Sequence, residues 1–555
     1  MKKFTPFILL LLITTLGFIV RFYRLGEAPA GLYLDEAAQG YNAYSILKTG
    51  RDEFGKFFPV VFRSFADFKT PIYIYLIVPL IPIFGLTPFT VRLPSFIFSV
   101  LTLPLVYFLI RRLLNRAKIA TPLALLTVLL LAISPWHTLF ARADFEANIA
   151  LFFLLLAIYV FYSALKRPSL LILSAFFFVV AFSAYHAERI IVPLILLLLF
   201  IRHYRTLLAT HQRPFLLAGL ILGFLLSLPT LFVMATPGWA ARATTLNIFA
   251  SNPSGYLAWY HGPASTLVNA SWYLWVKEFF ALYFSYLSPR NLFFLGDSNP
   301  RTAYPDLAPF FTWQFPLYLF GLYRLVKDTS LRELRFLILA LLLISPLPAA
   351  MTRDPFSTIR ALPLVIPLTL IITLGLIRSY QSLKPAGQRT LIRIGFVGVI
   401  IYSLFNLGSS AFVLNEYFNA KNWDYGWRQV VEVLNRLDPK LPLVVDSARG
   451  EIYSEILFFS RFSPLQYQEK NFEVPLDEYY QNLQRNPIKT IGNITVRGIA
   501  WKPDLAKEQY LVGDHLAISV EQIENNHLTL IKEINYPDGT PAFRIVKTNP
   551  NPTSE

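Results

Sequence analysis

The sequence predicts a mainly α-helical, polytopic membrane protein with about 11 transmembrane helices, several interfacial helices and a small C-terminal α/β domain. Three observations support this prediction. Of the 555 residues, 55% are hydrophobic and only 15% are charged, whereas soluble chains carry about 25% charged residues. Apolar runs of membrane-spanning length recur through the first three quarters of the chain. Residues 1–420 hold 35 Lys and Arg against 16 Asp and Glu, while the rest hold 15 against 18.

The same composition excludes several classes of protein. The chain has no cysteine, which excludes disulfides, thiolate metal sites and cysteine nucleophiles. Its net charge is +16, but the basic residues are scattered between apolar runs. A nucleic-acid-binding protein would gather them into a stripe that follows the phosphates, so we expect no nucleic-acid partner.

A transmembrane helix needs about 20 mostly apolar residues. The first apolar run could be a signal peptide, but the candidate cleavage site at residues 28–30 lies well beyond its apolar core, so we interpret it as the first span. Two further stretches, residues 71–84 and 266–287, are short or polar enough to lie along the interface as amphipathic helices. The expected spans are near residues 6–20, 89–110, 119–135, 147–165, 168–185, 187–201, 214–234, 310–326, 334–350, 361–377 and 391–412.

The distribution of charge predicts the orientation in the membrane. With the N-terminus in the cytoplasm, the inner segments hold 19 Lys and Arg against 2 Asp and Glu, and the outer loops hold 16 against 14. This is the asymmetry of the positive-inside rule. We therefore expect a multi-pass protein of the plasma membrane with a cytoplasmic N-terminus and an extracytoplasmic C-terminus.

The change in composition predicts two domains, a transmembrane catalytic domain over residues 1–418 and an extracytoplasmic domain over residues 419–555. The second alternates apolar strands, at residues 441–446 and 528–531, with a helix at residues 427–437, which is typical of a small α/β fold. Asp446, at a strand end, could be a site residue, but a turn or cap role is the simpler interpretation. A role of this domain in acceptor recognition is a hypothesis.

The outer loops contain most carboxylates of the transmembrane part. In residues 31–44, helical spacing places Asp35, Gln39 and Asn42 on one face of a short helix. Asp35 alone could be an N-cap. A catalytic role is favoured by other ionisable or polar side chains at the outer ends of predicted spans, namely Lys69, Asp144, Glu146, Tyr185, Glu188, Arg242, Arg301 and Arg360. A carboxylate that deprotonates a hydroxyl, with cations that hold a phosphate leaving group, suits glycosyl transfer from a phospholipid.

Simpler interpretations stay open for some of these residues. Asp144, with Arg142 and Glu146, could form a structural cluster of ion pairs, and His186 could be an interfacial histidine. Asp297 lies in Gly-Asp-Ser-Asn-Pro, a sequence that forms turns without any chemistry. Asp35 and Glu36 have no metal-ligand spacing, so we predict no metal site and no certain cofactor, with a divalent cation left open.

Several motifs occur in an order that resembles a known family. They are Asp35-Glu36 in the first outer loop, Lys69-Thr70-Pro71-Ile72-Tyr73, Arg92-Leu93-Pro94, residues 288–297, and residues 353–363 with Arg360-Ala361-Leu362-Pro363. Together they resemble the GT-C superfamily of polyprenyl-phosphate-sugar-dependent glycosyltransferases, in particular the protein O-mannosyltransferases and aminoarabinose lipid A transferases. Two positions depart from the pattern: Thr70-Pro71 replaces a doubled proline, and Arg301-Thr302 stands where a histidine is common.

The resemblance implies a function and roles for individual residues. The donor would be a sugar on a polyprenyl phosphate, the acceptor a hydroxyl of a protein, lipid or glycan, and the reaction one displacement with inversion at the outer face. Asp35, with Glu36, would form the catalytic set, and Lys69 would contact the lipid phosphate. Arg242 or Arg360 would assist Lys69, and Arg301, Asp144 and Tyr185 are the other expected substrate-binding residues.

The alternative is a membrane transporter or flippase of lipid-linked sugars. Transporters place ionisable residues and broken helices at the middle of the bilayer. The centres of the predicted spans are nearly free of charge, which favours the enzyme.

Overall fold

The computed structural model describes residues 5–65, 67–115, 117–237, 247–250, 262, 265–268, 270–328, 331–383, 386–448, 450–482 and 484–550. Contacts divide the chain into two compact units. We call residues 1–23, 95–235 and 239–410 the helical unit, and residues 24–94, 236–238 and 411–555 the mixed unit. The two units share helix α5 (Pro88–Leu114), which begins in the mixed unit and continues in the helical unit.

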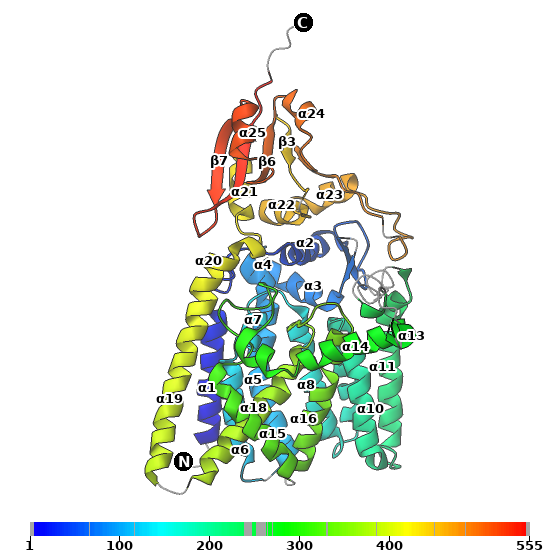
Figure 1. The fold of residues 1–555 in the computed structure, drawn as a ribbon. Coiled ribbons are helices and arrows are strands. Elements are labelled where there is room, and N and C mark those ends of the chain that lie inside the picture. The colour runs from blue at the N-terminus through cyan, green and yellow to red at the C-terminus, as the bar shows by residue number, and fades with distance from the viewer. Residues whose placement is uncertain are drawn as a thin grey trace. The chain divides into compact units, whose positions relative to one another are not determined.

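Every span expected from the sequence is a helix, and the long helices of the helical unit run alongside one another (Figure 1). Among the described residues, eight helical stretches are long and apolar enough to cross a membrane, when short helical segments that follow directly are included, as in Arg332–Ala350 and Gly387–Trp423. Taken singly, four of the helices are shorter, since α6, α15 and α16 have 13 residues each and α9 has 15. The helices are α1 (Thr5–Phe22), α5, α6 (Ala120–Ala132), α8 (Glu146–Ala164), α9 (Leu170–Ala184), α10 (Glu188–Leu207), α11 (Arg213–Met234), α15 (Phe315–Lys327), α16 (Arg332–Ile344), α18 (Val365–Ser382) and α19 (Ala386–Ser409).

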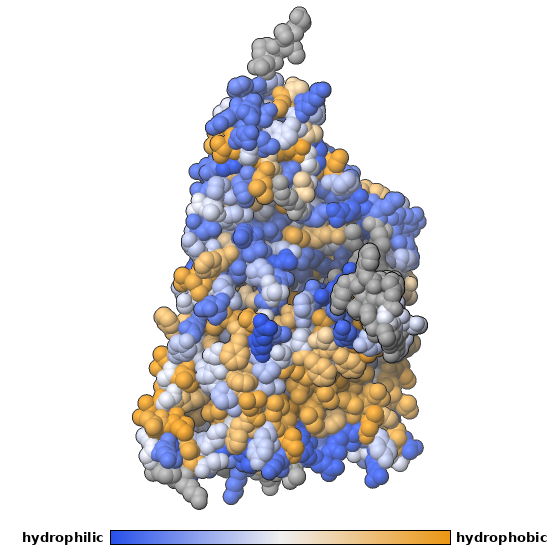
Figure 2. Space-filling model, viewed as in Figure 1, coloured by the Kyte–Doolittle hydropathy of each residue, from blue (hydrophilic) through white to orange (hydrophobic). Residues whose placement is uncertain are grey.

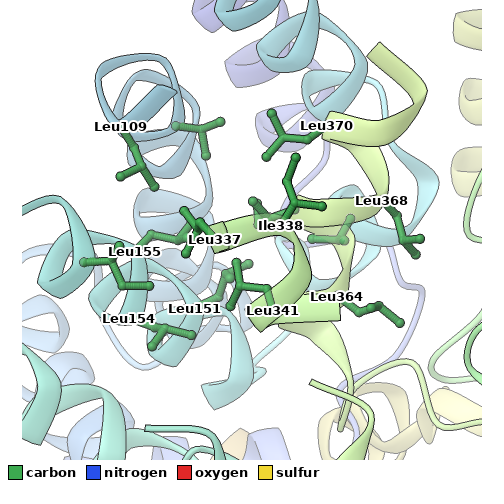
Figure 3. Packing of buried hydrophobic residues seen from close by; sticks show 14 of the residues in the cluster. Leu109, Leu151, Leu154, Leu155, Leu337, Ile338, Leu341, Leu364, Leu368 and Leu370 are labelled. Carbon is green, nitrogen blue, oxygen red and sulfur yellow. The ribbon is translucent and has the colours of Figure 1, made fainter. Parts of the chain in front are cut away.

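These helices pack through aliphatic side chains and expose others. Figure 3 shows Leu151 and Leu155 of α8 beside Leu337 and Leu341 of α16, in one buried cluster that also includes leucines of α5 and α18. Over the middle of the helices the surface in Figure 2 is mostly hydrophobic, and hydrophilic side chains gather at their lower ends. An apolar surface of this kind needs lipid rather than water around it, which confirms the prediction of a polytopic membrane protein.

Two glycines bring α15 and α18 into close contact. A Cβ atom added at Gly321 would lie 1.9 Å from the backbone oxygen of Ile371, and one added at Gly375 would lie 1.9 Å from that of Leu317. Any larger residue at either position would force these helices apart. Small residues commonly allow such close approach between membrane helices.

Shorter elements connect the spans of the helical unit. Helix α14 exposes Trp272, Val276, Phe280 and Phe284, which recur every four residues and therefore lie on one face. This apolar stripe fits the interfacial helix expected over residues 266–287. The shorter elements are α7 (Pro135–Phe140), η2 (Ile248–Ala250), α13 (Ser265–Val268), α14 (Ser271–Ser285), η4 (Asn291–Leu295), η5 (Thr312–Gln314), α17 (Leu347–Ala350), η7 (Leu362–Leu364) and η8 (Ser410–Leu414).

The mixed unit contains a six-stranded sheet of order β4-β5-β3-β6-β8-β7, in which β3 is parallel to β5 and β6 and the other pairs are antiparallel. This confirms a C-terminal α/β fold. Its strands are β3 (Leu443–Val445), β4 (Lys489–Ile491), β5 (Ile494–Val496), β6 (Tyr510–Asp514), β7 (Thr529–Asn535) and β8 (Pro541–Lys547). Its helices are α20 (Asn415–Asn419), η9 (Ala420–Trp423), α21 (Trp427–Leu434), α22 (Tyr453–Ser460), α23 (Pro464–Lys470), α24 (Trp501–Leu505) and α25 (Val520–Asn525).

The segment between α1 and α5, which the sequence predicts to be the first outer loop, belongs to this mixed unit. It contains α2 (Leu34–Thr49), the hairpin of β1 (Phe62–Ser64) and β2 (Asp67–Lys69), and the short helices α3 (Pro71–Ile77), η1 (Val78–Leu80) and α4 (Ile81–Phe84). Tyr41 of α2 lies in one hydrophobic core with Trp427, Val445 and Ile456. Residues 24–94, which the sequence assigned to the transmembrane domain 1–418, therefore pack as one body with residues 411–555.

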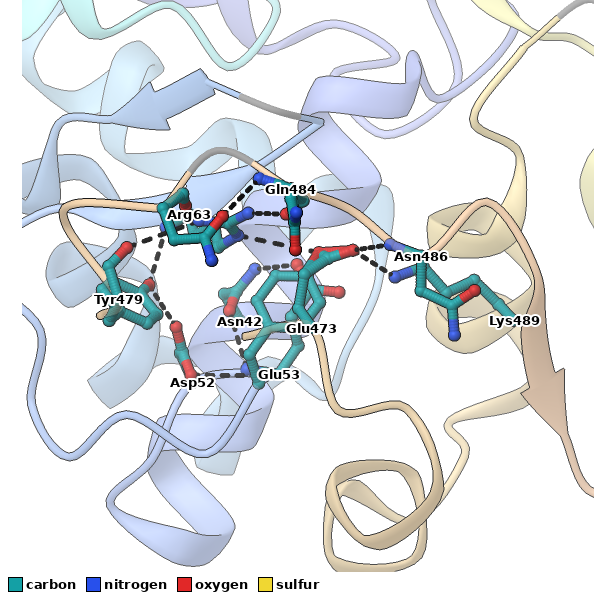
Figure 4. A network of polar contacts seen from close by, with 11 residues as sticks. Asn42, Asp52, Glu53, Arg63, Glu473, Tyr479, Gln484, Asn486 and Lys489 are labelled. Atoms are coloured by element: carbon teal, nitrogen blue, oxygen red, sulfur yellow. Dashed lines mark hydrogen bonds and ion pairs between the residues drawn. The ribbon is translucent and has the colours of Figure 1, made fainter. Parts of the chain in front are cut away.

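A buried polar network also links the first outer loop to the C-terminal part (Figure 4). Arg63 is fully buried, forms an ion pair with Glu473 and donates to the backbone oxygens of Asn482 and Gln484. The hydroxyl of Tyr479 donates to Asp52 (2.5 Å). A buried charge is costly unless it is paired, so these bonds specify how the two segments fit together.

Candidate active site

The first turn of α2 carries the two carboxylates expected to be catalytic. The helix begins at Leu34, and Tyr33 is its N-cap residue. Asp35 is therefore not the N-cap, which excludes the simpler interpretation of this residue. The backbone N–H of Leu34 instead donates to Asp424 (2.9 Å). This carboxylate from the C-terminal part satisfies one of the free N–H groups at the helix start.

The side chains of Asp35 and Lys69 are in contact, which the sequence did not predict. Lys69 Nζ lies 2.5 Å from Asp35 Oδ1. The side chain of Asp35 is 43% exposed and that of Lys69 is 13% exposed. Lys69 is the last residue of β2 and directly precedes Thr70, the N-cap of α3. A solvent-accessible carboxylate and an ammonium group thus stand side by side.

Glu36 has a different environment from its neighbour. It is buried, and both of its oxygens accept hydrogen bonds from Arg92, each at 2.9 Å. The Arg92 guanidinium also donates to the backbone oxygens of Leu25, Pro29 and Gly31. This bidentate, buried pair fixes the loop before α2, and it gives Glu36 a structural environment instead of the accessible position that a reacting carboxylate needs.

A third carboxylate, which the sequence did not indicate, lies in the helix that packs against α2. Glu455, in the first turn of α22, is completely buried, and its Oε2 accepts a hydrogen bond from Ser454 (2.9 Å). Burial, followed by the negative charges of Asp424 and Asp35, raises the pKa of Glu455 well above its ordinary value. About 420 residues separate Glu455 from Asp35, and no motif connects them.

The remaining predicted site residues, apart from Arg242, lie in the helical unit. Asp144 is buried in the loop before α8, Tyr185 follows α9, and Arg301 lies in a loop. Arg360 forms an ion pair with Asp354 and donates to Thr352 (2.9 Å). Arg242 lies outside the described residues.

Asp297 stabilises a turn and connects that turn to Thr358 through hydrogen bonds. It accepts hydrogen bonds from the backbone N–H of Asn299 (2.9 Å), the hydroxyl of Thr302 (2.8 Å) and both the N–H and hydroxyl of Thr358 (2.8 Å each). Burial raises its pKa, although these bonds oppose the shift. The geometry agrees with the simpler interpretation of this sequence.

Metal ligation was left open for Asp35 and Glu36. In the described part of the chain, no three His, Cys, Asp or Glu side chains come together in a way that could hold a metal ion.

Comparisons with known proteins support the resemblance seen in the motifs. The family model described as dolichyl-phosphate-mannose-protein mannosyltransferase matches residues 68–232. The crystal structure of ArnT from Cupriavidus metallidurans in the apo state matches with a TM-score of 0.53 and 12% identity, over 98% of this chain and 99% of that chain. The same protein bound to undecaprenyl phosphate matches with a TM-score of 0.53 and 11% identity, over the same shares of the two chains. No curated protein sequence matches this chain significantly.

The class of protein follows from these findings. The chain is a polytopic membrane protein with the fold of the GT-C glycosyltransferases. Its similarity extends over nearly the whole of ArnT, including the C-terminal domain, and the resemblance predicted from the motifs is confirmed. At 12% identity the likeness is one of fold.

Proposed function

We propose that this protein is an inverting glycosyltransferase that moves a sugar from a polyprenyl-phosphate carrier to an acceptor hydroxyl at the outer face of the plasma membrane. The observation that carries this proposal is the contact between Asp35 and Lys69, 2.5 Å apart at an accessible position. It supplies a proton acceptor and a phosphate-binding cation in one place.

The transfer is a single displacement at the anomeric carbon. Asp35 accepts the proton of the acceptor hydroxyl as its oxygen bonds to that carbon. The bond from the carbon to the phosphate oxygen breaks on the opposite face, which inverts the configuration. Lys69 offsets the negative charge that grows on the leaving phosphate. When the donor binds, Lys69 would exchange its ion pair with Asp35 for an ion pair with the phosphate. This exchange would release the Asp35 carboxylate to act as the base.

The other predicted residues take supporting roles in this proposal. Arg301 and Arg360, together with Arg242, would add positive charge around the lipid phosphate, and Asp144 and Tyr185 would contact the sugar or the acceptor. Glu36, held by Arg92, would support Asp35 from the same helical turn. The ArnT structure with undecaprenyl phosphate supports a lipid-phosphate donor for this fold.

The acceptor is a protein, lipid or glycan, and the transferred sugar is a hexose or a pentose. The acceptor meets the site on the extracytoplasmic side, because the inner segments carry the excess of Lys and Arg. Surrounding membrane lipids are the remaining partners. An extracytoplasmic site has no nucleotide sugars, which favours a lipid-linked donor.

The test supplies the purified full-length protein with a panel of polyprenyl-phosphate sugars, including mannose, arabinose-type and other hexose donors, and with candidate acceptors. Mass spectrometry then follows the free polyprenyl phosphate and the glycosylated product. We expect consumption of at least one donor with formation of a product of inverted configuration. Movement of intact donors across reconstituted vesicles, with none consumed, would instead identify a flippase.

A further inference from the structure

Glu455 lies where the C-terminal part of the chain meets the start of α2. Its neighbour Ser454 has its hydroxyl 3.4 Å from the backbone oxygen of Leu34, the residue before Asp35. Asp424, also from the C-terminal part, accepts from the N–H of Leu34 (2.9 Å). Gly40 of α2 is so close to Phe458 of α22 that an added Cβ would lie 2.6 Å from the Phe458 ring. The helix that carries Asp35 therefore rests directly on α22.

The environment of Glu455 opposes a negative charge. The side chain is completely buried, and Oε1 has no hydrogen-bond partner among the residues that the structure describes. The charged groups that act on it are the carboxylates Asp424 and Asp35. Lys69 pairs with Asp35 and Arg92 pairs with Glu36, and among the described residues Glu455 forms an ion pair with neither cation. When carboxylates share a region in this way, a buried one without a cation stays protonated.

We propose that Glu455 is a positioning residue for the transfer reaction, an uncharged carboxyl group that supports the start of α2 and so holds the proposed base Asp35 in place. This inference rests on the proposed function for its kinetic consequence. Glu455 is too deeply buried to touch substrate, so it acts through Asp35. The C-terminal part of the chain is thereby a component of the active site.

The test compares Glu455→Gln and Glu455→Ala in the full-length protein with a donor that the wild type consumes. The amide of Gln has the size and neutrality of a protonated carboxyl group, so Glu455→Gln should keep kcat within about threefold of wild type at pH 7. Glu455→Ala removes the group and should lower kcat about 10- to 100-fold with KM for the donor little changed. The control Glu432→Gln, an exposed residue of α21, should change neither value.

The pH dependence separates this role from simple packing. In the wild type, rising pH ionises Glu455 beside Asp424 and Asp35, and the repulsion should loosen the contact of α22 with α2 and reduce kcat. Because Gln cannot ionise, Glu455→Gln should lack this alkaline loss. An equal loss of activity in the Gln and Ala variants at pH 7, or identical pH profiles of wild type and Glu455→Gln, would overturn the proposal.

A spectroscopic measurement tests the charge state without any activity. The infrared spectrum of the wild type at pH 7 should contain the carbonyl band of protonated carboxylic acids, to which both Glu455 and Glu53 contribute. Glu455→Gln should reduce this band and leave the contribution of Glu53, while Glu432→Gln should leave the whole band unchanged. An unchanged band in Glu455→Gln would contradict the proposal. If no donor is consumed by the wild type, the proposed function fails, and this band still decides whether Glu455 is uncharged.

Discussion

Asp35 and Glu36 are adjacent in the sequence but have opposite environments. Successive residues of a helix point about 100° apart, so Asp35 faces Lys69 at an accessible surface and Glu36 faces the buried Arg92. The Asp-Glu motif therefore contains one accessible carboxylate and one buried carboxylate that anchors the loop. We therefore propose Asp35 as the only base, although the sequence suggested that both residues belong to the catalytic set.

Lys69 should be required for its charge. Lys69→Ala should raise KM for the polyprenyl-phosphate donor about tenfold or more, because a charge-assisted contact to phosphate is lost. Lys69→Arg should be affected less, since the cation remains. Steady-state kinetics with a short-chain donor measure both. Lys48→Ala, at an exposed position on α2, is the control. Wild-type kinetics in both Lys69 variants would remove the phosphate-binding role.

The sequence predicted Asp35 and Lys69 as site residues because each stands in a recognisable motif near a predicted span, and these roles stay predictions. It could not identify Asp424 and Glu455. Their relevance depends on the packing of α22 against α2, which joins segments about 420 residues apart, and neither has a local pattern. Glu36 is the opposite case. It stands in a motif, but the motif does not reveal that its side chain is buried and paired with Arg92.

At the scale of elements, Arg92 at the start of α5 holds the loop that precedes α2. Arg92→Met should destabilise the protein by about 3–5 kcal/mol, because Glu36 is left buried without its partner. Thermal unfolding in detergent measures the loss. The matched control is Arg428→Met, which breaks an exposed pair with Glu432 and should cost less than about 1 kcal/mol. Equal unfolding temperatures for the two variants would show that the Arg92 pair is not structural.

The network that joins the first outer loop to residues 473–489 should weaken as pH rises. Burial raises the pKa of Glu53 to about 8 and that of Asp52 to about 6. Both pKa values exceed those of the same groups in the unfolded chain. Between about pH 4 and pH 8 the folded state therefore binds more protons than the unfolded chain. Stability is therefore fully present below about pH 4 and falls as pH rises toward 8.

The Glu53→Gln variant tests this pH dependence. The wild type should lose about 2–4 kcal/mol more than Glu53→Gln between pH 5 and pH 8, as measured by chemical unfolding at the two pH values. Glu469→Gln, at an exposed position of α23, should behave as wild type. Parallel losses in wild type and Glu53→Gln would mean that Glu53 is ionised in the folded protein.

The helices were predictable from hydropathy, since every expected span is a helix. Their lengths were less predictable, because α6 and α15 have only 13 residues each. Hydropathy reports apolar character, whereas the end of a helix depends on local backbone constraints such as the prolines at the starts of α7 and α15.

At the scale of the whole molecule, contacts group residues 24–94 with residues 411–555, whereas the change in composition predicts a boundary at residue 419. Composition separates a polar tail from an apolar body, but it cannot show that a polar outer loop folds with that tail. Contacts such as those of Tyr41 with Trp427 and Ile456 decide this grouping. The net charge of +16 is likewise unevenly distributed along the chain. Most of the excess of Lys and Arg over Asp and Glu lies in the predicted inner segments.

The predicted orientation can be tested by labelling, because the chain has no cysteine of its own. Cysteines introduced separately at Asn115 and Gly450 should react with a membrane-impermeant reagent from opposite sides in intact cells and inverted vesicles. We expect residue 450 to be labelled from outside and residue 115 only from inside. Labelling of both from the same side would overturn the topology.

The most direct test of the central claim is the turnover of Asp35→Asn with a donor that the wild type consumes. We predict that this variant inserts and folds normally but transfers sugar at least about 100-fold more slowly, because amide replaces the proton acceptor. Glu27→Gln, an exposed carboxylate in the same outer loop, should retain wild-type turnover. Wild-type turnover by Asp35→Asn, measured by mass spectrometry of donor and product, would contradict the assignment of Asp35 as the base.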